Sequence, residues 1–115
     1  MNAGKPVGPI TVVVTTFNDG VLLSEALHSV VTQSLLPEQI LIVDDGSEPA
    51  TAPEIIGEVS DAANLKLDYV WQRNAGPSAA RNTGLRNATQ KFIAYLDSQG
   101  IRWRYKRRPA ATRAR

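Results

Sequence analysis

Carboxylates follow short apolar runs at two places in this sequence, and each run has the composition of a buried strand. At the first place, Asp44 and Asp45 come directly after Ile40 to Val43, and the turn pair Gly46 and Ser47 follows. Adjacent like charges are costly to bury, so we expect them to meet solvent, a cation or a donor-rich ligand. An apolar strand that brings acids to its carboxyl end is typical of an open α/β ligand site. A polar strand-to-loop junction without a ligand explains this stretch alone equally well.

Further polar groups could share a ligand with these acids. Asp97 follows the run Phe92 to Leu96, and Thr15 to Asn18 end a β-branched run near the N-terminus. A helix start just beyond the Gly76-Pro77 turn can hold an anionic group, and Arg81 adds positive charge in its first turn. Carboxylates suit base or ribose donors or a bridging cation, while guanidinium and amide groups suit phosphate. The combination favours a nucleotide diphosphate.

The elements that must position these residues alternate along the chain. Apolar β-branched runs predict strands, amphipathic stripes predict helices, and the connections are short. We expect strands at 10–16, 39–43, 65–72 and 92–96, and helices at 23–31, 51–63 and 78–89. Thr51 and Glu54 have the spacing of a capping box at the start of the second helix. The only histidine, His28, falls on a solvated helix face, and we expect no catalytic role for it.

This order of elements predicts an α/β fold, a Rossmann-like parallel sheet with helices on both faces. Alternating polarity at 65–72 indicates an edge strand, so the predicted order of the four strands is 3-2-1-4. The order reverses between the first and fourth strands, which places the ligand crevice beyond their carboxyl ends. Thr15 to Asn18, Asp45 and Asp97 should then surround one cleft, with Arg73 and Arg81 near it.

Length and composition limit the classes of protein that this chain can represent. Its 115 residues make one domain, or a piece of a larger one, and 43% hydrophobic residues support a core. Without cysteine there are no disulfides or thiolate metal sites, which fits a reducing compartment. Residues 1–9 are predicted to be a flexible lead-in rather than a secretory signal. We therefore expect a cytoplasmic protein whose globular part covers residues 10–98.

The charge is distributed very unevenly. Residues 1–100 contain six basic residues and all eleven acids, a net charge of −5, whereas residues 101–115 contain the other seven basic residues, a net charge of +7. The tail at 99–115 can be out of frame or follow a truncation after Asp97 or Ser98, which we favour. It can also be disordered, or form a basic patch, although we find no strong case for nucleic acid. We expect the last strand to be an unpaired edge, prone to self-association.

Five segments of the sequence carry a family resemblance, and they occur in a fixed order. Together they resemble family 2 glycosyltransferases of the GT-A fold over roughly residues 9–98, the nucleotide-sugar-binding half of such an enzyme. The resemblance also implies that a full-length member can act at the cytoplasmic face of the membrane. The segments are ITVVVTTFN, VVTQSL, QILIVDDGS, QRNAGPSAARNTGL and KFIAYLDS.

The resemblance implies a role for each matched position. The donor, a UDP-sugar by this resemblance, would have its base lined by Thr15, Phe17 and Asn18, with Phe17 available for stacking. Asp45 would accept a hydrogen bond from the base, and Asp44 would support the loop. Arg81 would lie near the donor. Asp97 would open the acidic motif that holds Mg²⁺ or Mn²⁺.

The sequence departs from the family in that acidic motif. The family reads LDSDD or a close variant, but here Gln99 and Gly100 stand after Asp97 and Ser98, so Asp97 is the one expected metal ligand left. Nothing after Gly100 resembles the acceptor half or its general base, so we assign no catalytic residue. We therefore expect an incomplete, donor-binding part of an enzyme that transfers a sugar to an unidentified acceptor hydroxyl.

Two other classes of protein share some of these features. A non-catalytic nucleotide-binding or interaction module would have the same cleft and no turnover. A phosphoacceptor receiver domain also has acids at strand ends. It fits less well, because it needs a lysine beyond its last strand and an isolated aspartate at the third.

Overall fold

A single mixed sheet organises the part of the chain that the structure describes. The computed structural model describes residues 4–98 and 103–107, the latter by their backbone. The strands follow the order β3-β2-β1-β4-β5, and β3, β2, β1 and β4 are parallel. The predicted α/β fold and the order 3-2-1-4 are therefore confirmed. The elements are β1 Val7–Thr16, α1 Gly20–Val31, β2 Leu36–Asp44, α2 Ala52–Ala63, β3 Asp68–Trp71, α3 Pro77–Asn87, β4 Phe92–Asp97 and β5 Trp103–Arg107.

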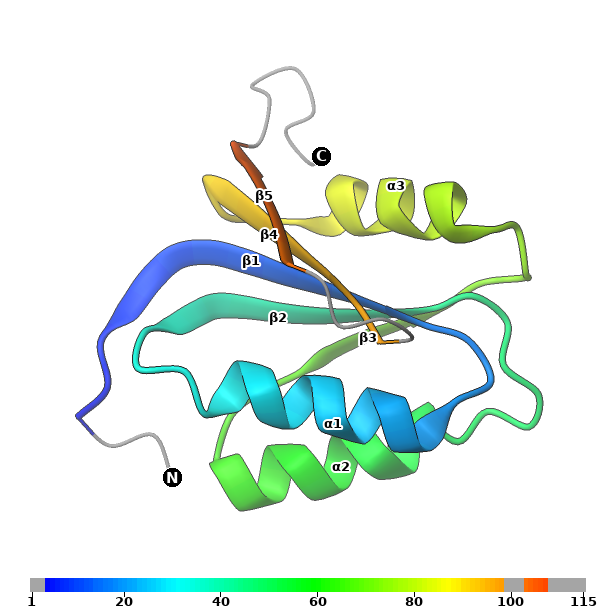
Figure 1. The fold of residues 1–115 in the computed structure, drawn as a ribbon, viewed down its shortest axis with the longest axis horizontal. Coiled ribbons are helices and arrows are strands. Elements are labelled where there is room, and N and C mark those ends of the chain that lie inside the picture. The colour runs from blue at the N-terminus through cyan, green and yellow to red at the C-terminus, as the bar shows by residue number, and fades with distance from the viewer. Residues whose placement is uncertain (1–3, 99–102, 108–115) are drawn as a thin grey trace.

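Helices cover both faces of the sheet, α1 and α2 on one side and α3 on the other (Figure 1). Along β2, Ile40 and Ile42 pack into the core below α1 and α2, while Leu41 and Val43 pack into the core below α3. Successive strand residues point to opposite faces, so a strand covered on both sides must be apolar throughout. Burying each such side chain contributes about 1.5–3 kcal/mol, which makes β2 the centre of the fold.

The helix α3 lies close to the sheet because its inner side is made of small residues. Ala80, Gly84 and Ala88 are buried there, as the sequence predicted. A methyl group added at Gly84 would overlap the side chain of Val13 on β1. Glycine is therefore required at this crossing, and it sets the height at which α3 and the loop before it sit above the strands.

The boundaries of several elements differ from the prediction. β1 begins at Val7, inside the expected lead-in, with an irregular register between Gly8 and Thr11 where Pro9 has no N–H to donate. The third strand is shorter than expected, beginning at Asp68. The capping box is wrong: Thr51 already has nearly helical dihedral angles, φ −96° and ψ −10°, and its side chain makes no capping hydrogen bond.

The expected unpaired edge at β4 is also wrong. β5 pairs with β4 in antiparallel register, from Leu96↔Trp103 to Phe92↔Arg107. Five residues of the basic tail thus form a strand, so an unstructured tail does not describe 103–107. The rest of the tail, 99–102 and 108–115, lies outside the described residues, as do positions 99 and 100 of the acidic motif. Among the described helices none has the length and apolar character needed to span a bilayer.

Candidate functional site

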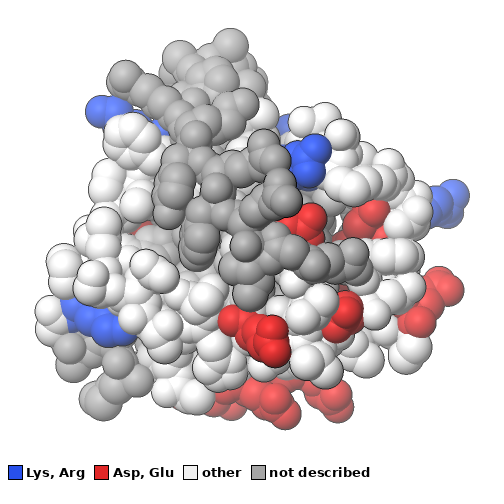
Figure 2. Space-filling view, viewed as in Figure 1, with Lys and Arg blue, Asp and Glu red and all other residues white. Residues whose placement is uncertain are grey.

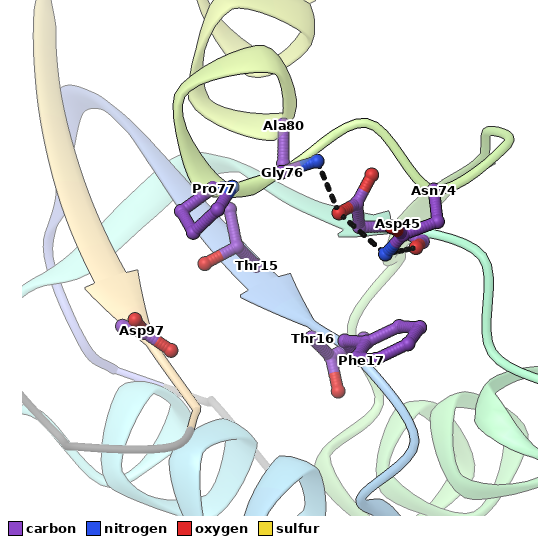
Figure 3. A pocket seen from close by; sticks show the side chains of 9 residues that line it. All are labelled: Thr15, Thr16, Phe17, Asp45, Asn74, Gly76, Pro77, Ala80 and Asp97. Carbon is purple, nitrogen blue, oxygen red and sulfur yellow. Dashed lines mark hydrogen bonds between the residues drawn. The ribbon is translucent and has the colours of Figure 1, made fainter.

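A pocket of about 250 Å³ opens at the carboxyl ends of β1, β2 and β4. The start of α3 closes one side of it, and Figure 3 shows Asp97 across the opening from Asp45 and Asn74, with Thr15 and Thr16 between them. This is where the strand order reverses, the place at which open α/β sheets bind ligands. The pocket is lined by Thr15, Thr16, Phe17, Asp45, Asn74, Gly76, Pro77, Ala80 and Asp97.

Strand geometry explains why these particular polar residues meet. Val13 on β1, Val43 on β2 and Tyr95 on β4 all belong to the core on the α3 side. Two residues further along, the same side of each strand carries Thr15, Asp45 and Asp97. The register Thr15↔Asp97 brings the first and last of these level with each other. The α3 side of three adjacent strand tips thus supplies the polar groups of the pocket.

Backbone hydrogen bonds continue the sheet beyond the ends of the strands and fix these tips. The Asp45 N–H donates to the Thr16 carbonyl at 2.9 Å, and the Ser98 N–H donates to the Thr15 carbonyl at 3.0 Å. The Gln72 N–H donates to the Asp44 carbonyl at 2.9 Å. The residues around the pocket are therefore placed by the sheet rather than by free loops.

The carboxylate of Asp45 holds together the loop in front of α3. Its Oδ1 accepts from Gln72 Nε2 and from the Ala75 N–H, both at 2.9 Å. Its Oδ2 accepts from the Gly76 N–H at 2.9 Å and from Asn74 Nδ2 at 3.1 Å. We call Asp45 with these four partners the Asp45 cluster. Four donors occupy the roughly four acceptor sites of the carboxylate, which stabilises the charge although Asp45 is only 6% exposed.

The turn after Asp45 depends on a glycine. Gly46 has a φ of +96°, in the region that favours glycine, and a Cβ there would lie 2.7 Å from the backbone nitrogen of Asn74. The two loops that border the pocket on this side are therefore in direct contact. Any side chain at Gly46 would push the Asp45 cluster apart.

Three of the seven residues expected to bind the ligand do not line the pocket. Asn18 instead joins two loops: its N–H donates to Ser47 Oγ at 2.7 Å, and its Oδ1 accepts from the Glu48 N–H at 2.9 Å. Arg81 lies on the exposed side of α3 and donates to Ser78 Oγ at 3.3 Å. Arg73, which was expected near the cleft, is exposed and does not line the pocket either.

Asp44, the third of these residues, faces the opposite side of the sheet from Asp45. It is fully buried, and its carboxylate accepts from the Ser47 N–H at 2.9 Å and from the Tyr69 hydroxyl at 3.0 Å. Burial, followed by the hydrogen bond to Asp44 and the negative charge of Asp44, raises the pKa of Tyr69 well above its usual range. Asp44 therefore supports the loop after β2 through the Ser47 N–H, as the resemblance implied. The sheet separates its carboxylate from the pocket.

Two of the lining residues, Asn74 and Ala80, were not predicted to border the cleft. Asn74 belongs to the loop after the third strand, and Ala80 belongs to the helix start that follows it. Thr16 lies within the predicted stretch Thr15 to Asn18, and Gly76 and Pro77 form the turn before the helix start that was expected to hold an anionic group. The signal that could have found Asn74 and Ala80 is the segment Arg73 to Ala80, because a loop entering a helix at the carboxyl edge of a parallel sheet must border the crevice. Thr15, Phe17, Asp45 and Asp97 are the predicted residues that the structure brings together there.

The surface charge is concentrated away from the pocket. Figure 2 shows acidic side chains gathered on the side where α1 and α2 lie, with basic side chains scattered around the rim. The α2 helix contributes Glu54, Glu58 and Asp61, all exposed. At the pocket, the charge of Asp45 is compensated by its four donors, and the start of α3 adds a partial positive charge.

A divalent cation is the cofactor that the acidic motif would be expected to hold. Within residues 4–98 and 103–107 no three potential ligand side chains come together as a metal site. Asp97 provides one carboxylate at the pocket, and the oxygens of Asp45 already accept four hydrogen bonds. Hard cations are bound by several oxygen ligands, so the described side chains do not by themselves fit such an ion.

The sequence matches one protein family over most of its length. The match, to the family described as Glycosyl transferase family 2, covers residues 11–100, which include every strand tip that forms the pocket. This chain belongs to glycosyl transferase family 2. A curated relative, the glycosyltransferase GlyA of Streptococcus pneumoniae, is 42% identical over 89 residues. The alignment with GlyA covers 77% of this chain and only 12% of the length of GlyA.

Solved structures of other glycosyltransferases share the fold. The mannosyltransferase PcManGT of Pyrobaculum calidifontis, in complex with GDP-Man and Mn²⁺, aligns with a TM-score of 0.68 and 25% identity, covering 86% of this family 2 chain and 29% of its own. TarS 1-349 of S. aureus, in complex with UDP-GlcNAc, aligns with a TM-score of 0.62 and 27% identity, covering 77% and 26%. The expected GT-A glycosyltransferase fold is therefore confirmed, and this chain is short relative to both proteins.

Proposed function

We propose that this chain is the donor-binding part of a glycosyltransferase and binds a nucleotide-diphosphate sugar in the pocket at its strand tips. The observation that carries the proposal is the convergence of Thr15, Asp45 and Asp97 on one pocket at the point where the strand order reverses. The sugar would pass from the donor to an acceptor hydroxyl in the whole protein. A cytoplasmic location belongs to the same proposal.

The residues of the pocket have distinct roles in this proposal. Phe17 is 37% exposed, which leaves a face of its ring accessible for stacking on a base. Thr15 and Thr16 supply hydroxyls that can donate or accept. Gly76 and Pro77 bring the positive end of α3 to the place where a diphosphate would lie.

Asp45 has a particular constraint in this scheme. A direct hydrogen bond from the base to Asp45 requires one of its four present donors to move, because the carboxylate is already fully used. The Asn74 side chain is the donor that can leave at the smallest cost, since Asn74 is exposed and water can replace its partner.

Calorimetric titration of the chain tests this proposal. UDP, GDP and their sugars are titrated with and without Mn²⁺, because solved relatives contain UDP-GlcNAc in one case and GDP-Man with Mn²⁺ in another. Saturable binding that is lost in Phe17→Ala supports the pocket as the site, and absence of binding to every nucleotide contradicts it. Hydrolysis or transfer of a bound nucleotide sugar distinguishes an enzyme from a non-catalytic binding module, which gives neither.

A further inference from the structure

A line of polar side chains runs from the interior of α3 to the carboxylate at the pocket. Thr83, in the second turn of α3 and only 8% exposed, donates from its hydroxyl to Gln72 Oε1 at 2.5 Å. Gln72 in turn donates from Nε2 to Asp45 Oδ1 at 2.9 Å. Arg86 donates from Nη2 to Thr83 Oγ1 at 3.1 Å. Arg86, Thr83, Gln72 and Asp45 therefore form a continuous hydrogen-bonded relay.

The chemistry of the two ends fixes the direction of this relay. A guanidinium group can only donate, so Thr83 must use its oxygen to accept from Arg86 and its hydrogen to donate elsewhere. A carboxylate can only accept, so Gln72 must turn its NH₂ group toward Asp45 and its oxygen toward Thr83. Both requirements agree on one orientation of the Gln72 amide. Hydrogen bonds aligned in this way strengthen one another.

We propose that Thr83 and Gln72 are positioning residues for the donor pocket, acting through Asp45. The inference rests on the proposed function and adds the groups that keep Asp45 in place. The Asp45 carboxylate holds the Ala75 and Gly76 amides, and Gly76 and Pro77 form one wall of the pocket (Figure 3). A rotated Asp45 would release this wall, although neither Thr83 nor Gln72 lines the pocket.

The relay differs from ordinary core packing because it depends on one hydroxyl. Thr83→Val keeps the shape of the side chain and removes the donor to Gln72, so that the Gln72 amide is no longer fixed in the position from which its NH₂ group reaches Asp45. Thr83→Ser keeps the hydroxyl and removes only a methyl group. If the hydroxyl matters, serine preserves the pocket and valine does not. A purely steric role for Thr83 predicts the opposite order.

Amide hydrogen exchange provides a measurement that needs no ligand. Ala75 is exposed and Gly76 half-buried, and their N–H groups both donate to Asp45. Their exchange rates therefore report the position of the Asp45 carboxylate. We expect about tenfold faster exchange at both amides in Thr83→Val and parent-like rates in Thr83→Ser.

Nucleotide affinity provides the second measurement. We expect the Kd for the nucleotide bound by the parent chain to rise about fivefold in Thr83→Val, about tenfold in Gln72→Leu, and less than about twofold in Thr83→Ser, as loss of one charge-assisted hydrogen bond to a buried carboxylate predicts. Gln39→Leu is the matched control, because Gln39 holds the other end of α3, far from the pocket. We expect it to lower the melting temperature and to leave the Kd and both amides unchanged.

Each outcome of this experiment decides the proposal. Parent-like exchange in Thr83→Val overturns it, and so does equally fast exchange in Gln39→Leu, which would indicate general loosening. Faster exchange with unchanged affinity, in a protein that binds nucleotide, also overturns it. If the parent chain binds no nucleotide, the proposed function fails, and the exchange rates alone then support or overturn the relay.

Discussion

Two side chains, one in β2 and one directly after it, hold the two ends of α3, and they do so with opposite chemistry. Asp45, at the carboxyl end of the strand, accepts from the Ala75 and Gly76 amides ahead of the helix. Gln39, near the amino end, donates to the Asn87 carbonyl in the last turn and accepts from the Thr89 N–H just beyond it, at 3.2 and 2.9 Å. One helix is thus fixed at both ends to a single central strand.

The other partners of Gln39 complete a second group, which we call the Gln39 cluster: Gln39 with Thr11, Asp68, Asn87 and Thr89. Its Oε1 also accepts from Thr11 Oγ1 at 2.7 Å, and its Nε2 also donates to Asp68 Oδ2 at 3.2 Å. Partners of both kinds surround Gln39, whereas every partner of the Asp45 carboxylate is a donor. An amide can both donate and accept, which suits the donors and acceptors around Gln39. A carboxylate only accepts, which suits the four donors around Asp45.

The difference follows from the polarity of a helix. The start of a helix presents unpaired N–H groups and its end presents unpaired carbonyls. An acid is therefore favoured near the start of α3, and a side-chain NH₂ group near its end. The same polarity makes the Asp45 end suitable for an anionic ligand, while the Gln39 end only joins β1, β2, β3 and α3.

Removing the carboxylate of the Asp45 cluster should have the largest effect. Asp45→Ala leaves two backbone amides and two side-chain donors without their acceptor, so we expect the free energy of unfolding to fall by about 3 kcal/mol and nucleotide binding to be lost. Chemical denaturation and calorimetry measure the two effects. Asp45→Asn is the matched control. It keeps the shape of the side chain but replaces one accepting oxygen with an NH₂ group, which faces donors and cannot accept from them. Near-parent stability in Asp45→Ala would contradict the structural role.

A substitution in the middle of α3 tests both clusters at once. Gly84→Ala places a methyl group against Val13, and overpacking of this kind costs about 2 kcal/mol. Because α3 must lift from the sheet, hydrogen bonds at both of its ends should lengthen. Hydrogen exchange at Ala75, Gly76 and Thr89 measures this directly. Gly57→Ala, at an open position on α2, is the control and should not reduce stability.

Breaking the Gln39 cluster should separate stability from binding. We expect Gln39→Leu to lower the free energy of unfolding by about 1.5 kcal/mol, because it removes several partly exposed hydrogen bonds at once. The nucleotide affinity should stay within about twofold of the parent value, since the cluster lies at the opposite edge of the sheet. A large loss of affinity would show that the two ends of α3 are coupled and would remove the contrast drawn between them.

The parallel part of the fold was predictable from local signals. The runs Val12 to Val14 and Ile40 to Val43 are apolar throughout because helices cover both faces, and short connections leave few topologies. β5 was missed because the tail was interpreted as an out-of-frame, disordered or basic binding segment and not as part of the sheet. The alternation of Trp103 and Tyr105 with Arg104 and Lys106 is the strand signal that it carried. No local signal states which existing strand such a segment joins.

The candidate site was predictable in its location and less so in its individual contacts. Alternation along β2 already requires Asp44 and Asp45 to face opposite sides, so only one of them could reach the pocket. Asn18 and Arg81 could not be placed this way, because loop and exposed helix side chains are not fixed by strand register. Gln72 and Thr83 gave no signal, since their importance depends on a contact between a loop and a helix 11 residues apart.

The smallest expected effect concerns Asp44, and it is measured as a change in how stability depends on pH. In Tyr69→Phe the buried Asp44 carboxylate loses one of its donors, and we expect the free energy of unfolding to fall by about 1 kcal/mol near neutral pH. The raised pKa of Tyr69 adds a second signature. A group whose pKa is higher in the folded state gives a contribution that is fully present below the unfolded pKa, near 10.0, and is lost as the pH rises above it.

The parent chain should therefore lose stability above about pH 10 more steeply than Tyr69→Phe. Urea denaturation of both proteins between pH 7 and pH 11, values chosen to span the tyrosine range, measures the difference in slope. The relay at Asp45 contains no tyrosine, so Thr83→Val should retain the parent slope. Equal slopes in the parent and Tyr69→Phe would show that burial and the contact with Asp44 do not raise the pKa of Tyr69 in the folded protein.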